Sequence, residues 1–155
     1  MSKPPSAESR HLQIPIGPRL EAAAAGADDG ASWREGLRLG LAELLRFVVE
    51  EPDAAMSLIV DGRAACPAAL QRRDEFLDHY AGCIDTQVRE ESADPPPSAI
   101  AAAGIVGGIE ALLYSRLNRG ETENLESLLP SLMYFAVLPY EGHEAASEEL
   151  AVPVR

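Results

Sequence analysis

Residues 98–142 constrain the fold most, because they describe two apolar helices joined by a short turn. No charged residue occurs from Pro95 to Ile109, and this stretch contains Gly104, Gly107 and Gly108. Each glycine inside a helix costs about 1 kcal/mol relative to alanine. A helix that is apolar all round is buried on all sides, and glycine lets a second backbone approach closely. We therefore expect one face of this hairpin to pack on its own domain and another to meet a partner.

The composition favours packed helices over a sheet. Of the 155 residues, 46% are hydrophobic but only 5% are aromatic, whereas strands prefer aromatic and β-branched side chains. A chain of this length fits one domain. Cys66 and Cys83 form no CxxC motif, so we interpret both as buried thiols in a reducing compartment. We therefore expect an all-α domain without a disulfide.

The charge of the chain excludes one broad class of function. The formal net charge is −12, whereas binding to nucleic acid depends on clustered lysine and arginine. The first residues contain prolines where a signal peptide would need an apolar core, and we find no segment of about 20 apolar residues that would span a membrane. We therefore expect a cytoplasmic protein that contacts neither nucleic acid nor a membrane through these residues.

Proline and glycine divide the chain into predicted helices. Apolar residues recur at helical intervals between these breaks, and Ser32, Pro67 and Ser98 suit helix starts. The predicted helices span about 32–51, 53–60, 67–90, 98–118 and 123–138, and a frayed last helix can follow position 142. We expect a flexible arm and linker over 1–31, with one or two helical turns at 19–25, a helical domain over 32–146 and a tail over 147–155.

The order of these features resembles the C-terminal half of the tetracycline-repressor (TetR) family of bacterial transcriptional regulators. The segments that carry the resemblance are WREGLRLGLAELLRFVVEEPD, GRAACPAALQRRDEFLDHYAGCI and SAIAAAGIVGGIEALLYSRLNRGETENLESLLPSLMYFAVLPYEGHEAA. The resemblance implies a bundle of five to six helices with an apolar effector pocket, whose last two long helices form a four-helix dimer interface. In that family a helix-turn-helix domain binds DNA. Residues 1–31 lack the pattern of a recognition helix, so the resemblance implies the sensing half alone, with DNA contact only through a domain absent from this chain.

The family layout places a pocket for a small apolar or amphipathic effector among the predicted helices from 32 to 118. Its candidate lining residues are Trp33, Leu37, Leu41, Met56, Phe76, His79, Tyr80, Ile109 and Leu113. An apolar stripe at helical spacing also describes an ordinary core, so both interpretations stay open for these positions. His79 is either a polar handle that orients the ligand or a solvated histidine at the edge of its helix.

The last two predicted helices carry the candidate interface of a homodimer. Its residues are Ile100, Gly104, Gly107, Ala111, Tyr114, Leu128, Leu132, Tyr134 and Phe135. The alternative is that these residues only pack the two helices against each other within one chain. If two chains do associate here, we expect about 1,200–2,000 Å² of buried surface.

Motifs of enzymes are missing from the sequence. GxSxG, HExxH, Walker and GxGxxG patterns do not occur, so we expect no enzymatic activity, no cofactor and no metal site. The expected function is a domain that senses an effector and dimerises. One alternative is a stand-alone acidic module that heterodimerises with an intact regulator, without ligand or DNA binding of its own. Another is a small helical enzyme without recognisable motifs.

Overall fold

The computed structural model describes residues 14–28, 30–61, 66–91, 98 and 100–154, and within these ranges the chain forms helices and turns but no strand. The predicted all-α class is therefore confirmed. In chain order the elements are α2 (Gly17–Ala25), α3 (Trp33–Glu50), α4 (Pro52–Ala55), the π-helix η2 (Met56–Asp61), α6 (Pro67–Glu91), α7 (Ile100–Asn118), the 3-10 helix η3 (Leu125–Leu128) and α8 (Leu129–Leu150). These bounds agree with the predicted helices 32–51, 67–90 and 98–118 to within two residues.

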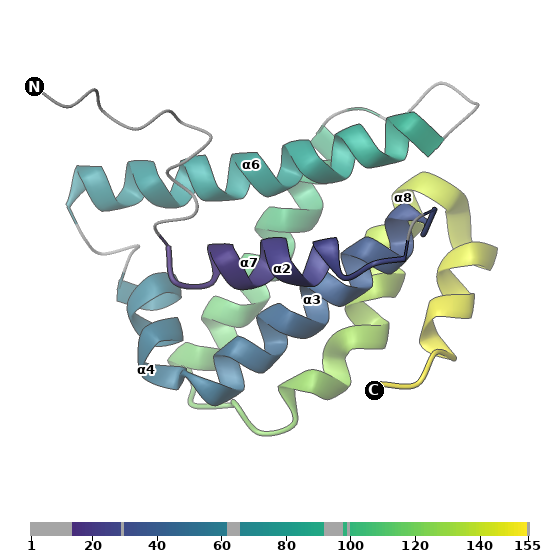
Figure 1. Cartoon of the computed structure of the whole chain (residues 1–155). Coiled ribbons are helices and arrows are strands. Elements are labelled where there is room, and N and C mark those ends of the chain that lie inside the picture. Colours follow the sequence, from purple (N-terminus) through teal and green to yellow (C-terminus); the bar gives the residue numbers. More distant parts are fainter. Residues whose placement is uncertain (1–13, 29, 62–65, 92–97, 99, 155) are drawn as a thin grey trace, which may run out of the picture.

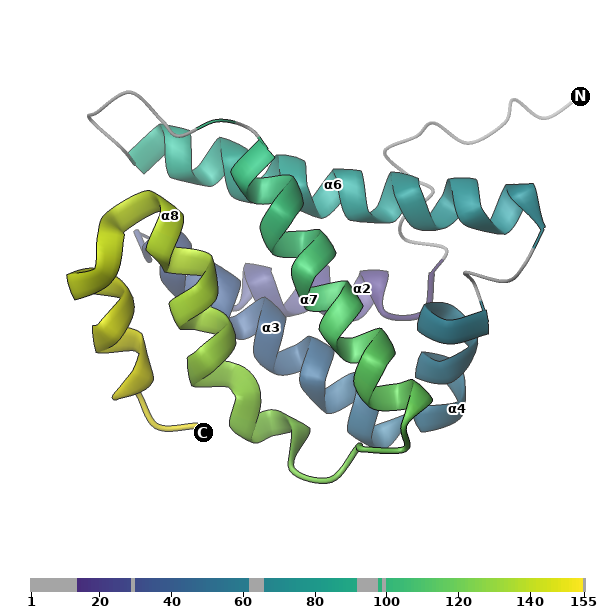
Figure 2. The ribbon, with the colours of Figure 1, turned by 180° about the vertical axis from the view of Figure 1, so that it is seen from behind.

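Helix α3 is central in the fold and packs against α2, α6 and α8. Figure 1 shows α2 in front of α3 with α6 running above both, while α7 and α8 lie behind. Figure 2 shows α7 and α8 side by side on that opposite face. The core forms between these layers because each helix turns an apolar stripe inward. Its largest fully buried side chains are Phe47, Ile16, Leu45, Leu113, Leu117, Leu125, Met133, Val48, Val88 and Val137.

The helical turns predicted at 19–25 are confirmed by α2, but the segment from residue 14 to residue 25 is packed, which corrects the prediction of a flexible arm there. Ile16 is fully buried, and Ile14 and Leu20 are each 8% exposed. Pro18 lies in the first turn of α2, where its fixed φ angle suits a helix and its missing N–H is not needed. Burial of these apolar side chains against α3 offsets the entropy of ordering the segment. The rest of the predicted arm, residues 1–13, lies outside the described part of the chain.

Helix α8 extends well beyond its predicted end before Pro139. Pro130 occupies its first turn, and Pro139 lies inside it. At Gly142 the backbone takes φ 80° and leaves the helical conformation, which only glycine does at low cost. A second helical stretch follows this kink and ends at Leu150, as the prediction of a last helix after position 142 expected. The predicted boundary at 146/147 is therefore wrong, since the helix continues across it.

The segment after Gly142 packs back on the start of α3. Trp33 Nε1 donates a hydrogen bond of 2.9 Å to Glu141 Oε1, and Arg34 Nη1 lies 3.1 Å from Glu149 Oε1. Arg38 pairs with the other oxygen of Glu149, whose side chain is only 7% exposed. Two guanidinium groups therefore compensate this carboxylate for its loss of hydration.

Helix α7 corrects the expectation that no segment could span a membrane. By length and composition, α7 is apolar enough to do so, and 28% of its most apolar window is buried inside the protein. Core helices of soluble proteins meet the same criterion. Near its middle α7 carries Glu110, whose Oε2 lies 2.9 Å from Nη2 of Arg73 on α6. This ion pair ties α7 to its own fold.

Candidate functional site

A cavity of about 240 Å³ lies between α2, α3, η2, α6 and α7. Most of its wall is aliphatic or aromatic, and a few polar groups lie at its edges. Its lining residues are Ile14, Ile16, Leu20, Glu21, Ala24, Gly36, Leu37, Gly40, Leu41, Leu44, Leu58, Ile59, Arg73, Phe76, Leu77, Tyr80, Cys83, Ile84, Gln87, Val106, Ile109, Glu110 and Leu113. Concave sites that bind small molecules have this character, a mostly apolar wall with a few placed polar groups.

Six of the nine candidate pocket residues lie on this wall, namely Leu37, Leu41, Phe76, Tyr80, Ile109 and Leu113. Trp33 does not, because its ring packs edge-on against Tyr140 at a centroid distance of 5.4 Å and its N–H bonds to Glu141. Met56 packs against the core without lining the cavity. His79 is likewise absent from the wall and contacts Glu21 at the edge of α6.

The cavity exists largely because α3 presents glycines where a core helix would carry side chains. Gly36 and Gly40 both line it and lie four residues apart, so they share one face of the helix. A Cβ atom placed on either glycine would meet no other atom within 4 Å. The spacing of Gly36, Leu37, Gly40, Leu41 and Leu44 is visible in the sequence, and it could have indicated a hollow on this side of α3.

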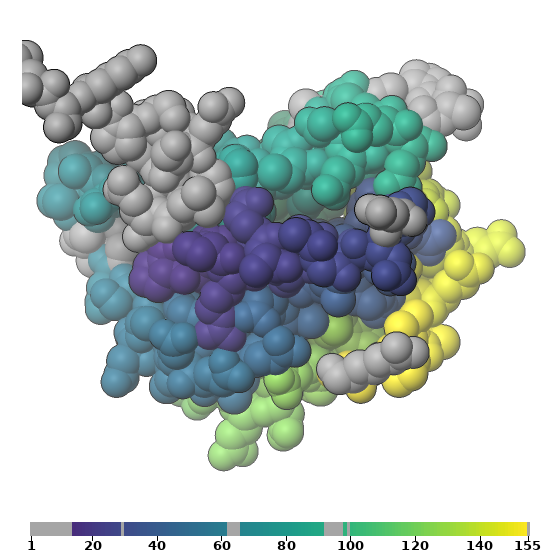
Figure 3. All heavy atoms as spheres, viewed as in Figure 1, coloured from purple at the N-terminus to yellow at the C-terminus, as the bar shows by residue number. Residues whose placement is uncertain are grey.

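Helix α2 and the residues before it supply a wall that the sequence analysis missed. Ile14, Ile16, Leu20 and Glu21 all line the cavity. The signal available was the i, i+4 pair of Ile16 and Leu20, together with a proline suited to the first turn of a helix. Figure 3 shows the atoms of α2 lying across this face between α6 and the helices below it. Access to the cavity from this side therefore depends on α2.

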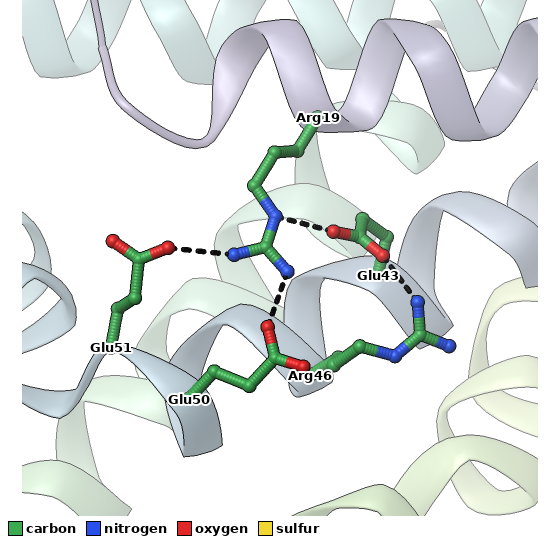
Figure 4. A network of polar contacts seen from close by, with 5 residues as sticks. All are labelled: Arg19, Glu43, Arg46, Glu50 and Glu51. Carbon is green, nitrogen blue, oxygen red and sulfur yellow. Dashed lines mark hydrogen bonds and ion pairs between the residues drawn. The ribbon is translucent and has the colours of Figure 1, made fainter.

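An ion-pair network holds α2 on α3 (Figure 4). Arg19 of α2 donates to Glu43, Glu50 and Glu51 over 2.5, 2.8 and 2.8 Å. The hydrogen bonds to Glu50 and Glu43 raise the pKa of Arg19, and its guanidinium lies 5.5 Å from the ring centroid of Phe47. Glu43 also accepts from Arg46 at 2.6 Å. The network therefore fixes the wall that α2 contributes.

Two polar clusters lie at the edges of the cavity. In the first, Arg73 Nε donates to Glu110 Oε1 at 3.1 Å, while its Nη1 donates to Asp74 at 2.8 Å. The Glu110 side chain is 11% exposed. Because the guanidinium already faces two carboxylates, this cluster carries a net negative charge.

The second cluster joins α2 to α6. His79 Nε2 lies 3.3 Å from Glu21 Oε1 and 3.7 Å from Cys83 Sγ. Burial raises the pKa of the Tyr80 hydroxyl, and the charge of Glu21 adds to this effect. Burial, and to a smaller extent the charge of Glu21, also raise the pKa of the Cys83 thiol. A thiol in this setting is a poor nucleophile, and within the described ranges no group of three or more His, Cys, Asp or Glu side chains could hold a metal ion.

The candidate interface residues divide between surface and core. Ile100 is 77% and Phe135 45% exposed, and Gly104 and Ala111 are also exposed. Half-buried positions are Gly107, Tyr114, Leu128 and Tyr134. Leu132 is only 5% exposed and packs in the core, so its assignment to the interface is wrong. The helical period assigned Leu132 to the exposed side of α8, whereas it lies on the adjacent, buried side.

The exposed face of α7 and α8 also includes residues that the sequence analysis did not single out. Leu138 is 37% exposed, and Ala103 and Gly108 are exposed on α7. A Cβ atom on Gly108 would lie 3.2 Å from the Phe135 ring, whereas Cβ atoms on Gly104 and Gly107 would meet nothing. Gly108 therefore serves the packing of α7 on α8. Gly107 instead lines a small hollow between α7 and α6, while Gly104 is exposed.

Comparison of the chain with protein-family models, with curated proteins and with solved structures gives no match.

Proposed function

We propose that this chain is a TetR-type effector-binding and dimerisation domain that acts in the cytoplasm. A small apolar or amphipathic molecule would occupy the cavity between α2, α3, α6 and α7. Two copies would associate through α7 and α8, which would then form a four-helix bundle. The domain would act by changing conformation and would catalyse no reaction. DNA contact in an intact regulator would belong to a separate domain.

One observation carries this proposal: α7 lines the cavity with one side and contributes to the exposed face with another. Val106, Ile109 and Leu113 line the cavity, while Ile100 and Gly104 of the same helix are exposed. A ligand that pressed on the cavity side of α7 would move the surface offered to a partner. An effector changes the arrangement of a dimer only if it binds two arrangements unequally, and a shared helix supplies a direct route for this.

The charge distribution supports self-association through this face. The chain carries 25 acidic residues, yet residues 100–109 of α7 and 129–140 of α8 contain no charged residue. Two copies of a protein with a net charge of −12 repel each other over most of their surfaces. An uncharged, apolar surface is the part through which they can approach at the lowest electrostatic cost, and exposed apolar patches commonly mark interaction sites.

The proposal is tested by measuring oligomeric state and cavity occupancy on the same samples. Native mass spectrometry of the protein as purified from cells should report a dimer with an additional small mass. Nile red, a neutral apolar dye, should bind with increased fluorescence. The variant Gly40→Leu, which places a side chain in the cavity, should lose dye binding, whereas Gly82→Leu on the exposed side of α6 should keep it.

The outcomes separate the proposal from its main alternative. A dimer that binds no dye, or equal dye binding by both variants, would refute the sensing role and favour an acidic module that pairs with another regulator. A monomer at all concentrations would refute the dimer.

A further inference from the structure

We propose that the ligand of the cavity is an apolar amine or ammonium, a molecule with an aliphatic or aromatic body and one positive charge. This inference rests on the proposed sensing function and adds the chemical class of the effector. It excludes fatty acids and other apolar carboxylates as the preferred ligands.

The charges at the cavity wall favour a cation. Glu21 and Glu110 line the cavity, and Arg73 is the one basic side chain among its described lining residues. All three nitrogens of the Arg73 guanidinium are engaged, Nε and Nη2 with Glu110 and Nη1 with Asp74. An anionic ligand would have to displace one of these carboxylates and then remain beside it. A cation would share Glu21 with His79, and the formal charge of the described lining side chains, Glu21 and Glu110 against Arg73, is negative.

Two aromatic rings add a second element of cation recognition. Phe76 and Tyr80 both line the cavity, and their ring centroids are 4.8 Å apart at an interplanar angle of 56°. The faces of aromatic rings attract ammonium groups, and the attraction is stronger where water is excluded. The side-chain hydrogen bond between Tyr80 and Glu21 places a carboxylate next to this ring pair. Two aromatic rings and a carboxylate therefore lie together on this part of the wall.

The electrostatic field inside the cavity has the same sign. The charge of Glu21 disfavours ionisation of both Tyr80 and Cys83, in addition to the effect of burial on their pKa values. Both groups become anions when they ionise, so the field that opposes their ionisation also opposes an anionic ligand. The net charge of −12 on the whole chain would further raise the local concentration of cations and speed their association.

The test compares three probes that share a decyl chain and differ only in the head group. Isothermal titration calorimetry of the full chain should give the tightest binding for decyltrimethylammonium, weaker binding for decanol and the weakest for decanoate, each used below its micelle concentration. Decanoate binding as tightly as the ammonium would overturn this inference and leave the sensing function intact. Failure of all three probes to bind would refute the sensing function itself.

Two pairs of variants test whether Glu21 supplies the attracting charge and whether the probe binds in the cavity. Glu21→Gln should weaken ammonium binding about threefold to tenfold, a modest factor because Glu21 is partly exposed to solvent. Glu90→Gln removes the same charge from an exposed position of α6 and should leave the affinity unchanged. Equal effects of the two changes would remove Glu21 from the site. Ammonium binding that survives in Gly40→Leu as well as in Gly82→Leu would place the probe outside the cavity and refute the inference.

Discussion

Replacement of Gly40 by alanine should make this protein more stable, although the glycine lies on the wall of its cavity. Glycine in a helix interior costs about 1 kcal/mol relative to alanine, and the added Cβ meets no atom within 4 Å. The new methyl group would lie against an apolar wall and contributes up to about 0.8 kcal/mol more if it is fully removed from water. We therefore expect Gly40→Ala to raise the free energy of unfolding by about 1–2 kcal/mol.

Thermal or urea denaturation measures this gain directly. For a chain of this size, 1 kcal/mol corresponds to a shift of about 3 °C in Tm, so Gly40→Ala should raise Tm by about 3–6 °C. Protein concentration must be the same for all variants, because the stability of a dimer depends on it. Gly82→Ala is the matched control, since Gly82 is exposed on α6 and its Cβ also meets no atom. The control should show the propensity gain alone.

A loss of stability in Gly40→Ala would refute the reasoning, because it would mean that the space beside this glycine is filled. A gain equal to that of Gly82→Ala would remove the contribution from the apolar wall. The expected gain also has a functional meaning: a stabilising change was available at this position, and the chain instead keeps a hollow. Proteins commonly retain such costs where function requires them.

Three further predictions concern the dimer, α2 and the thiols. Gly104 is exposed on α7 and a Cβ atom there meets no other atom of the chain, so Gly104→Leu should abolish or weaken the dimer in sedimentation experiments without unfolding the monomer; an unchanged association constant would remove α7 from the interface. Arg19→Met should lower the free energy of unfolding by about 1–2 kcal/mol, since several partly exposed ion pairs are lost, and should speed proteolytic cleavage of the chain on the C-terminal side of α2. The control Arg46→Met leaves Arg19 in place and should lower the free energy of unfolding by less than about 1 kcal/mol. Equal losses of stability in the two variants would contradict the role of Arg19 as the anchor of α2. Cys83 should react with iodoacetamide more slowly than the exposed Cys66 at neutral pH, because a raised pKa lowers the thiolate fraction. Its rate should continue to increase with pH above the range in which the rate of an ordinary thiol levels off. Equal rates of the two cysteines at pH 7 in peptide mass spectrometry would contradict the assigned burial.

The helices that the sequence predicts well are those whose apolar period is long and whose ends are marked by proline or glycine. Helices α3, α6 and α7 belong to this group. The turns of α2 were predicted at 19–25, but its packing on the domain was not, because the apolar side chains that dock it, Ile14, Ile16 and Leu20, lie among prolines that suggest an open arm. The course of α8 after Pro139 depends on a kink at Gly142, where φ is positive, and on partners far away in the sequence, which a local pattern cannot reveal.

The cavity was predictable in part for the same reason. Helical spacing shows which side of a helix is apolar, and together with the layout that the resemblance implies it indicated Phe76, Tyr80 and Ile109. Spacing does not distinguish neighbouring residues, which point about 100° apart on a helix. His79 was therefore included among the candidate lining residues of the cavity, although it lies at the edge of α6. Nor does spacing show an empty space, which here results from the absence of side chains at Gly36 and Gly40.

The hydrogen bond between Trp33 and Glu141 has a practical consequence for studies in solution. Trp33 is the single tryptophan of the chain, and it lies where α8 returns to the start of α3, away from the cavity wall. Intrinsic fluorescence therefore reports the docking of the C-terminal segment and does not report direct contact with a ligand. A spectral shift on ligand addition would show that a change in the cavity has reached the contact between the first turn of α3 and the C-terminal segment, so the protein contains its own optical probe of transmission between the two regions.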